Sequence, residues 1–87
     1  MSQFGDCAEE IYNIIANSSY DYRFHTESIL EEVFDTMLIF INYEDMIEIV
    51  KKRVLPKVVC KLVHTEYDMF WVNYLENKIQ EWTTFLG

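Results

Sequence analysis

Cysteine and histidine side chains, which can bind metals or act as nucleophiles, are few in this sequence. Cys60 and His64 are four residues apart, so a helix would place both side chains on one side. With Cys7 and His25 they are all the Cys and His of the chain, and four such ligands can hold a zinc ion. A Cys60–His64 nucleophile pair is another alternative, although no third group that would orient it is visible. Packing of Cys60 as a small apolar side chain is the simpler interpretation, so we predict no metal and no cofactor.

Glycine and carboxylate patterns typical of enzyme sites are missing from this sequence. The two glycines are Gly5 and Gly87, so the chain holds no glycine-rich loop of the kind that binds phosphates. Acidic residues are abundant, but no sequence context marks one of them as desolvated or as a general acid or base. We therefore predict that the protein is not an enzyme.

The charge of the chain is unevenly distributed. The formal net charge is −8, from 15 acidic and 7 basic residues. Residues 1–50 hold 11 acids and one base, residues 51–61 hold five bases and no acid, and residues 62–87 hold four acids and one base. Because an acidic surface repels phosphates, we predict no direct binding of nucleic acid. The acidic half of the chain is the part that suggests a function.

Three acids recur at helical spacing in that half. Glu27, Glu31 and Asp35 stand at i, i+4 and i+8, which stacks them on one helix face about 6 Å apart, with Glu32 on the flank. One interpretation is a solvated face that keeps an apolar protein soluble. The other is an anionic stripe that imitates successive phosphates and occupies the basic cleft of a nucleic-acid-binding partner.

The order of features in residues 11–50 resembles that of the Ocr family of bacteriophage anti-restriction proteins. The matching stretches are Ile11-Tyr-Asn-Ile-Ile15, Tyr20-Asp21, Thr26-Glu27-Ser-Ile29, Asp35 and Tyr43-Glu-Asp45-Met-Ile47. Members of that family are acidic, helical, dimeric DNA mimics that fill the DNA-binding cleft of restriction enzymes. The resemblance implies a role as phosphate mimics for five acids, namely Glu27, Glu31, Asp35, Glu44 and Asp45. The basic residues 51–61 have no counterpart in that family.

Those basic residues form a cluster of their own, made of Lys51, Lys52, Arg53, Lys57 and Lys61. Glu44 and Glu48 are placed to pair with Lys51 and Lys52 along the same helix. The rest of the cluster can touch nucleic acid or pair with acids on a neighbouring helix or subunit. The acidic surplus of the chain favours pairing.

Sparse turn residues and long apolar stretches favour an all-α fold, a small bundle of four to five helices in a single domain covering residues 1–87. The predicted helix starts are Asp6 with Glu9, Thr26 with Glu27, Asn42 with Glu44 and Asp45, and Thr65 with Asp68. On the second helix we predict one continuous apolar face, made of Ile29, Leu30, Val33, Phe34, Met37, Leu38 and Ile41.

Pro56 is expected to kink or break the third helix, because proline lacks an N–H and crowds the preceding turn. The apolar pattern resumes after it, at Val58, Val59, Leu62 and Val63, which favours a restarted helix. The β-branched residues of 57–63 leave a strand as the alternative.

The apolar content of the chain exceeds what a small core can hide. Apolar residues make up 51% of the sequence, and a chain of this length buries only about 60–65% of the surface that its unfolded form exposes. We therefore expect a homodimer, and at least one interface residue among the aromatics of the last helix: Phe70, Tyr74, Trp82 and Phe85.

The N-terminal residues lack the basic and apolar regions of a signal peptide, and the longest apolar run, residues 37–41, is too short to span a membrane. We expect a cytoplasmic protein, in the host cytoplasm if it is viral. The leading hypothesis is a small acidic inhibitor that presents Glu27, Glu31, Glu32, Asp35, Glu44 and Asp45 as phosphate mimics to a protein with a basic nucleic-acid-binding cleft. The alternative is a structural or adaptor module that binds a protein partner through its apolar and aromatic surface.

Overall fold

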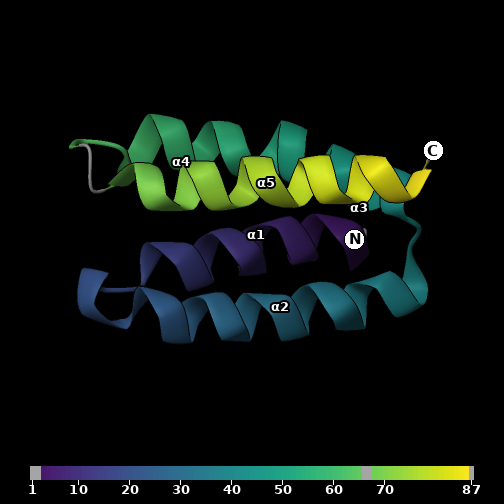
Figure 1. The fold of residues 1–87 in the computed structure, drawn as a ribbon, viewed down its shortest axis with the longest axis horizontal. Helices are drawn as coiled ribbons and strands as arrows, with labels where there is room; N and C mark the ends of the chain where they lie inside the picture. Colours follow the sequence, from purple (N-terminus) through teal and green to yellow (C-terminus); the bar gives the residue numbers. More distant parts are fainter. Residues whose placement is uncertain (1–2, 66–67, 87) are drawn as a thin grey trace.

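The described part of the chain is an up-and-down bundle of four helical rods. The computed structural model describes residues 3–65 and 68–86, and no strand occurs among them. In chain order the elements are α1 (Gln3–Ala16), the 3-10 helix η1 (Tyr20–Tyr22), α2 (Arg23–Phe40), α3 (Tyr43–Ile49), the π-helix η2 (Val50–Val54), α4 (Leu55–Leu62) and α5 (Met69–Leu86). Each rod runs antiparallel to the one before it, and α3, η2 and α4 form a single rod (Figure 1). The predicted all-α bundle is confirmed.

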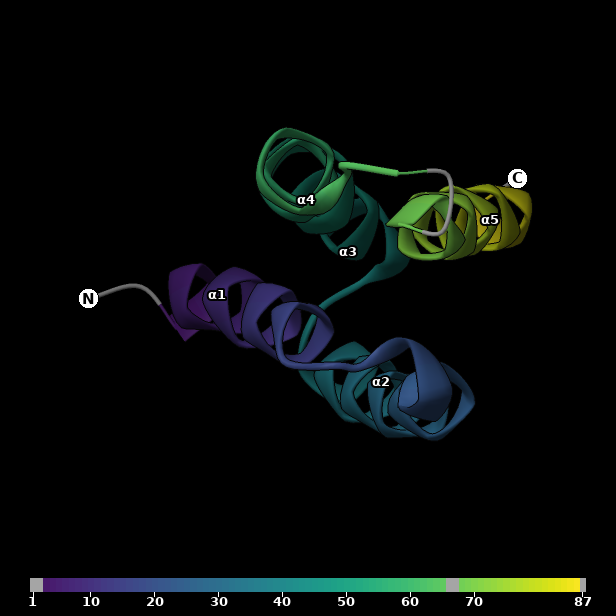
Figure 2. The same ribbon diagram turned by 90° about the vertical axis from the view of Figure 1, so that its left-hand side faces the viewer.

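The four rods form two layers, with α1 and α2 in one and the α3–α4 rod and α5 in the other (Figure 2). Every rod contributes to one core between the layers. Phe34 of α2 meets Trp82 of α5 edge to face, with ring centroids 5.0 Å apart. Val50 and Val54 of η2 are completely buried, so the π-helix supplies the middle of the core. Burial of these side chains is the main force that holds the layers together.

The predicted irregularity near Pro56 takes the form of a widened turn rather than a break. The N–H of Leu55 bonds to the carbonyl of Val50, five residues back, and α4 follows with Pro56 in its first turn. A proline ring in an ordinary α-helix would clash with the carbonyl four residues earlier, here that of Lys52. The wider turn lets the rod continue past the proline. The alternative of a strand over 57–63 is wrong, because α4 covers this stretch as far as Leu62.

The predicted start at Asn42 is confirmed by its hydrogen bond, and the predicted pair Thr65 and Asp68 is joined by hydrogen bonds just before α5. The side chain of Asn42 accepts a bond from the N–H of Asp45 at 2.8 Å and caps α3. The carboxylate of Asp68 accepts the N–H groups of His64 at 2.7 Å and Thr65 at 2.9 Å, and α5 begins at the next residue. These two backbone bonds hold the pKa of Asp68 below its usual range.

The other two predicted starts are wrong. The first helix begins at Gln3 rather than near Asp6. The second begins at Arg23, because η1 leads directly into it, and Thr26 lies inside the helix as a buried residue. Its hydroxyl donates to the carbonyl of Tyr22 at 3.1 Å and accepts from the hydroxyl of Ser18 at 2.7 Å. Thr26 therefore ties the α1–α2 connection to α2 instead of capping the helix.

Six of the seven residues of the apolar face predicted on the second helix are buried in the core or packed against it, and Ile29 is the exception. Leu30, Phe34 and Met37 are buried in the core. Ile29 and Phe40 are 38% and 71% exposed, and Val33 is half-buried. Ile29, Val33 and Phe40 lie on the α1 side of the helix and line the groove described below. No helix in the described part of the chain is long and apolar enough to cross a membrane.

Candidate partner-binding surface

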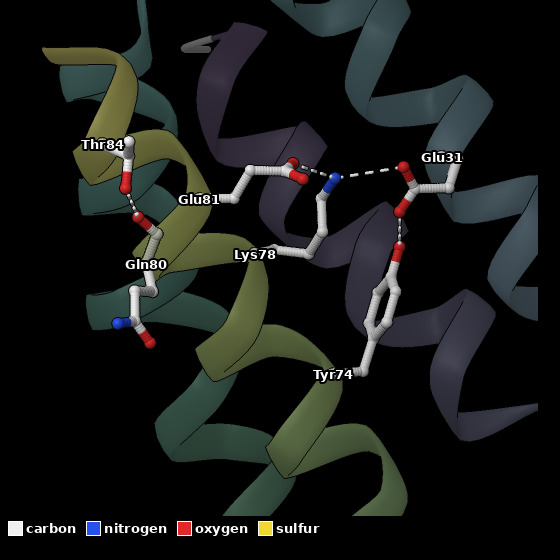
Figure 3. A network of polar contacts seen from close by, with 6 residues as sticks. All are labelled: Glu31, Tyr74, Lys78, Gln80, Glu81 and Thr84. Atoms are coloured by element: carbon white, nitrogen blue, oxygen red, sulfur yellow. Dashed lines mark hydrogen bonds and ion pairs between the residues drawn. The ribbon is translucent and has the colours of Figure 1, made fainter.

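The central acid of the predicted ladder, Glu31, is held by α5. Lys78 of α5 donates to one oxygen of the Glu31 carboxylate at 3.0 Å, and the hydroxyl of Tyr74 donates to the other (Figure 3). Lys78 also bonds to Glu81, one turn further along α5, at 2.8 Å. Glu31 therefore links the two layers, and its negative charge is balanced inside the molecule.

Lys78 is well suited to this position. Its side chain is only 13% exposed, and its ammonium lies 5.4 Å from the centre of the Trp82 ring and 6.0 Å from that of Phe34. Burial by itself lowers the pKa of Lys78, but hydrogen bonds to Glu81 and Glu31 and the charges of these acids outweigh it, so the pKa is raised. The side chain of Lys78 is therefore protonated and bonds to the carboxylates of Glu31 and Glu81.

The pKa of Tyr74 depends on the acids that surround its hydroxyl. Burial raises its pKa most, followed by its hydrogen bond to Glu31 and by the negative charges of Glu31, Glu27 and Glu81. Glu27 lies one helical turn before Glu31, and its charge also acts on Tyr74. Two of the three acids of the ladder, Glu27 and Glu31, thus act on Tyr74 of α5.

The other candidate phosphate mimics face solvent. Glu32, Asp35, Glu44 and Asp45 are exposed, and no ion pair joins them to a base in residues 3–65 and 68–86. The first two lie on α2. The last two lie in the first turn of α3, which begins at the end of the bundle where α2 ends (Figure 1). The structure thus divides the six candidates between one helix and the start of the next.

Part of the basic cluster pairs within the molecule, as predicted. Lys57 of α4 bonds to Glu9 of α1 at 3.1 Å and lies 4.3 Å from the centre of the Tyr12 ring. Lys52 pairs with Glu48 along its own rod at 3.1 Å. The expected pairing of Glu44 is not among the ion pairs of the described residues.

The four aromatics predicted to supply an interface have different environments. Trp82 is 1% exposed, so its assignment to an interface is wrong: it fills the core against Phe34. Phe70 is half-buried and stacks edge to face on Trp71, while Tyr74 is engaged with Glu31. Phe85 is 60% exposed and remains a candidate, with its ring centroid 5.1 Å from that of Tyr43.

A groove between α1 and α2 was not predicted from the sequence. Its volume is about 400 Å³. The residues that line it are Cys7, Glu10, Ile29, Glu32, Val33, Thr36, Met37, Phe40 and Ile41. The sequence pattern that could have indicated the groove is a second row of apolar residues on α2, beside the row that faces the core. This row is made of Ile29, Val33 and Phe40.

The cysteines and histidines are not gathered into a site. The described residues contain no group of three or more His, Cys, Asp and Glu side chains placed to hold a metal ion. Cys60 is exposed on α4, so its expected packing in the core is also wrong. Its neighbour Val58 is the residue of this turn that is buried.

No protein-family model, curated protein or solved structure matches this chain at a significant level. Its function is therefore inferred from its own surface. The surface offers exposed carboxylates on α2 and α3, the groove beside α1, and exposed apolar side chains such as Ile39 and Phe85.

Proposed function

We propose that the protein is a small acidic interaction protein that inhibits a nucleic-acid-binding enzyme by presenting carboxylates where that enzyme binds phosphates. The observation that supports this most strongly is the set of exposed acids Asp35, Glu44 and Asp45, which have no basic partner among residues 3–65 and 68–86. Glu27 and Glu32 add to the same charge. Glu31 contributes less, since Lys78 and Tyr74 already hold its carboxylate.

Electrostatics gives the proposed mechanism. A cleft lined with Lys and Arg attracts an acidic surface from a distance, and salt weakens this attraction by screening. Glu44 and Asp45 lie in the first turn of α3, where the partial positive charge of the helix end stabilises carboxylates. These two acids are therefore held on a rigid element, as a phosphate mimic requires.

The resemblance of residues 11–50 to the Ocr family supplies the specific version of the proposal. In this version the protein is a viral counter-defence protein that acts in the host cytoplasm on a restriction enzyme, and it works as a homodimer. Sedimentation equilibrium tests the dimer directly. A monomer at all concentrations up to the millimolar range would contradict this part of the proposal.

A charge-matched pair of variants tests the mimicry. Asp35→Asn/Glu44→Gln/Asp45→Asn removes three exposed acids from the proposed surface. Asp21→Asn/Glu48→Gln/Glu76→Gln removes three exposed acids elsewhere. Each immobilised protein is exposed to a lysate of a restricting bacterial host, and captured enzymes are identified by mass spectrometry. Each captured enzyme is then tested for release of a labelled DNA duplex when the free protein is added.

We expect the wild-type chain and the control to capture a DNA-binding enzyme and release its DNA, and the first variant to do neither. Raising the salt concentration should weaken capture, because exposed charges are screened beyond about 8–10 Å at physiological ionic strength. Circular dichroism checks that both variants remain helical. Capture that is equal for both variants would contradict the mimicry.

The adaptor hypothesis is the second candidate, and exposed apolar side chains favour it. Phe24, Ile39, Phe40 and Phe85 are all at least 60% exposed. Ile39, Phe40 and Phe85 are on the last turns of α2 and α5, which lie at the same end of the bundle (Figure 1). A partner that binds through this end should be retained by the triple acid variant and at high salt.

A further inference from the structure

The groove between α1 and α2 has an apolar lining that extends along α2. Ile29, Val33 and Phe40 lie on it at positions i, i+4 and i+11, with Thr36 between the last two. Eleven residues of helix rise through about 16 Å, so this apolar lining is about three helical turns long. Ile29 and Phe40 are 38% and 71% exposed. The bundle thus leaves a long apolar strip uncovered beside its core.

The rim of the groove is acidic on both walls. Glu10 projects from α1 and Glu32 from α2, and both side chains are exposed. No Lys, Arg or His is among the residues that line the groove. The first 50 residues contain a single base, Arg23, and it lies at the start of α2, away from Phe40. An occupant of this groove therefore meets apolar side chains of α2 together with one carboxylate from each helix.

We propose that the α1–α2 groove binds a basic amphipathic helix of a partner protein. Apolar side chains spaced at i, i+3, i+4 and i+7 on that helix would lie on Ile29, Val33 and Phe40. Lys or Arg residues on its flanks would pair with Glu10 and Glu32. The apolar strip of three turns is as long as such a helix. The negative charge of the rim favours a helix that carries positive charge.

A second copy of this chain fits the groove less well. Two copies joined through the same groove would bring Glu10 and Glu32 of one copy close to the same acids of the other. Repulsion between these like charges is unfavourable. The chain's own basic segment, Lys51 to Arg53, cannot act as the occupant, because the apolar residues beside it, Val50 and Val54, are fully buried in their own core.

This inference goes beyond the proposed function and is tested with different residues. Mimicry is tested at Asp35, Glu44 and Asp45, none of which lines the groove. The groove is tested at Glu10, Glu32, Ile29 and Phe40. Either proposal can therefore fail while the other stands.

The probe is a fluorescein-labelled peptide of Leu and Lys with the repeating pattern LKKLLKL, which places apolar residues at helical spacing. Fluorescence anisotropy measures its dissociation constant for the full chain. Two reference peptides accompany it: a shuffled peptide of the same composition without an apolar face, and the acidic counterpart LEELLEL. We expect micromolar binding of the first peptide, and binding of both references at least about tenfold weaker.

Four variants locate the binding. Ile29→Ser/Phe40→Ala should weaken binding by about tenfold or more, since it removes apolar anchors that are 38% and 71% exposed. Glu10→Gln/Glu32→Gln should weaken it by about fivefold and reduce its salt dependence. The matched controls are Ile39→Ser, an exposed apolar residue outside the groove, and Asp21→Asn/Glu76→Gln, two exposed acids outside it. Both controls should bind within about twofold of the wild-type chain.

Several outcomes would overturn the proposal. Equal binding of the shuffled peptide would show that charge alone attracts the probe. Groove variants that bind like the wild-type chain, or amide chemical-shift changes confined to α4 and α5, would place the site elsewhere. A wild-type dimer that Ile29→Ser/Phe40→Ala converts to a monomer would show that a second copy occupies the groove.

Discussion

Glu31 and Lys78 form an ion pair across the two layers of the bundle, with 3.0 Å between the carboxylate oxygen and the ammonium nitrogen. They are 47 residues apart in the chain. The lysine is largely buried, so its charge depends on Glu31 and on Glu81 for compensation. Glu31, the central acid of the ladder, therefore connects α2 to α5.

Replacement of Lys78 by methionine should destabilise the fold. Glu31 and Glu81 would then face one another without a cation at a half-buried position, and we expect the free energy of unfolding to fall by about 2 kcal/mol. Lys52→Met is the matched control, because it removes an exposed pair with Glu48 and should cost no more than about 0.5 kcal/mol. Urea unfolding followed by circular dichroism measures both. Equal losses for the two variants would contradict the connecting role of Lys78.

The stability of the protein should fall in alkali because of Tyr74. Its pKa in the folded state is raised above the ordinary value of 10. Above pH 10 the folded protein therefore keeps a proton on Tyr74 that the unfolded chain releases. This contribution is complete below pH 10 and decreases as the pH rises above it. Tyr74→Phe should therefore unfold with a shallower pH dependence above pH 10. Urea midpoints at a series of pH values test this, and identical slopes for variant and wild type would refute it.

The start of α5 should weaken in acid because of Asp68. The pKa of this carboxyl is lowered by the N–H groups of His64 and Thr65, so its contribution to stability is present above the ordinary pKa of 3.8 and is lost as the pH falls through the lower folded value. Hydrogen exchange at the amides of His64 and Thr65 reports the cap. We expect Asp68→Asn to accelerate exchange of both amides at neutral pH. Unchanged exchange would show that the carboxylate does not protect them.

Trp82 and Phe85 should differ sharply in their effect on stability, although they are three residues apart on α5. Trp82→Ala opens a cavity in the core and should lower the free energy of unfolding by about 3–5 kcal/mol. Phe85→Ala removes a ring that is 60% exposed and should cost about 1 kcal/mol or less. The same urea titration compares them. A large loss for Phe85→Ala would assign this ring to the core as well.

Features controlled by a few neighbouring residues were predictable from the sequence. The caps at Asn42 and Asp68 follow from side chains that reach backbone groups three or four residues away. The irregular turn before Pro56 follows from a ring and a missing N–H within one turn of helix. Thr26 was misplaced because η1 continues into α2, and the hydroxyl partner that engages it, Ser18, is eight residues away.

The candidate surface depended on contacts between distant residues. The spacing of Glu27, Glu31 and Asp35 is a property of the sequence, but the partner of Glu31 is on another helix. Likewise, both rows of apolar residues on α2 are readable in the sequence, whereas the identity of the buried row depends on where α5 and the α3–α4 rod pack.

By itself, the sequence determined the helical class, the acidic character of the first 50 residues and the local signals that begin α3 and α5. Composition and hydrogen bonds over short stretches suffice for these, because they involve neighbours that the chain fixes. Only the tertiary structure decided that Trp82 is core, that Glu31 is paired and that Ile29 and Phe40 border an open groove. Burial and ion pairing are set by which helices pack together, since a side chain's environment comes mostly from residues far away in the sequence.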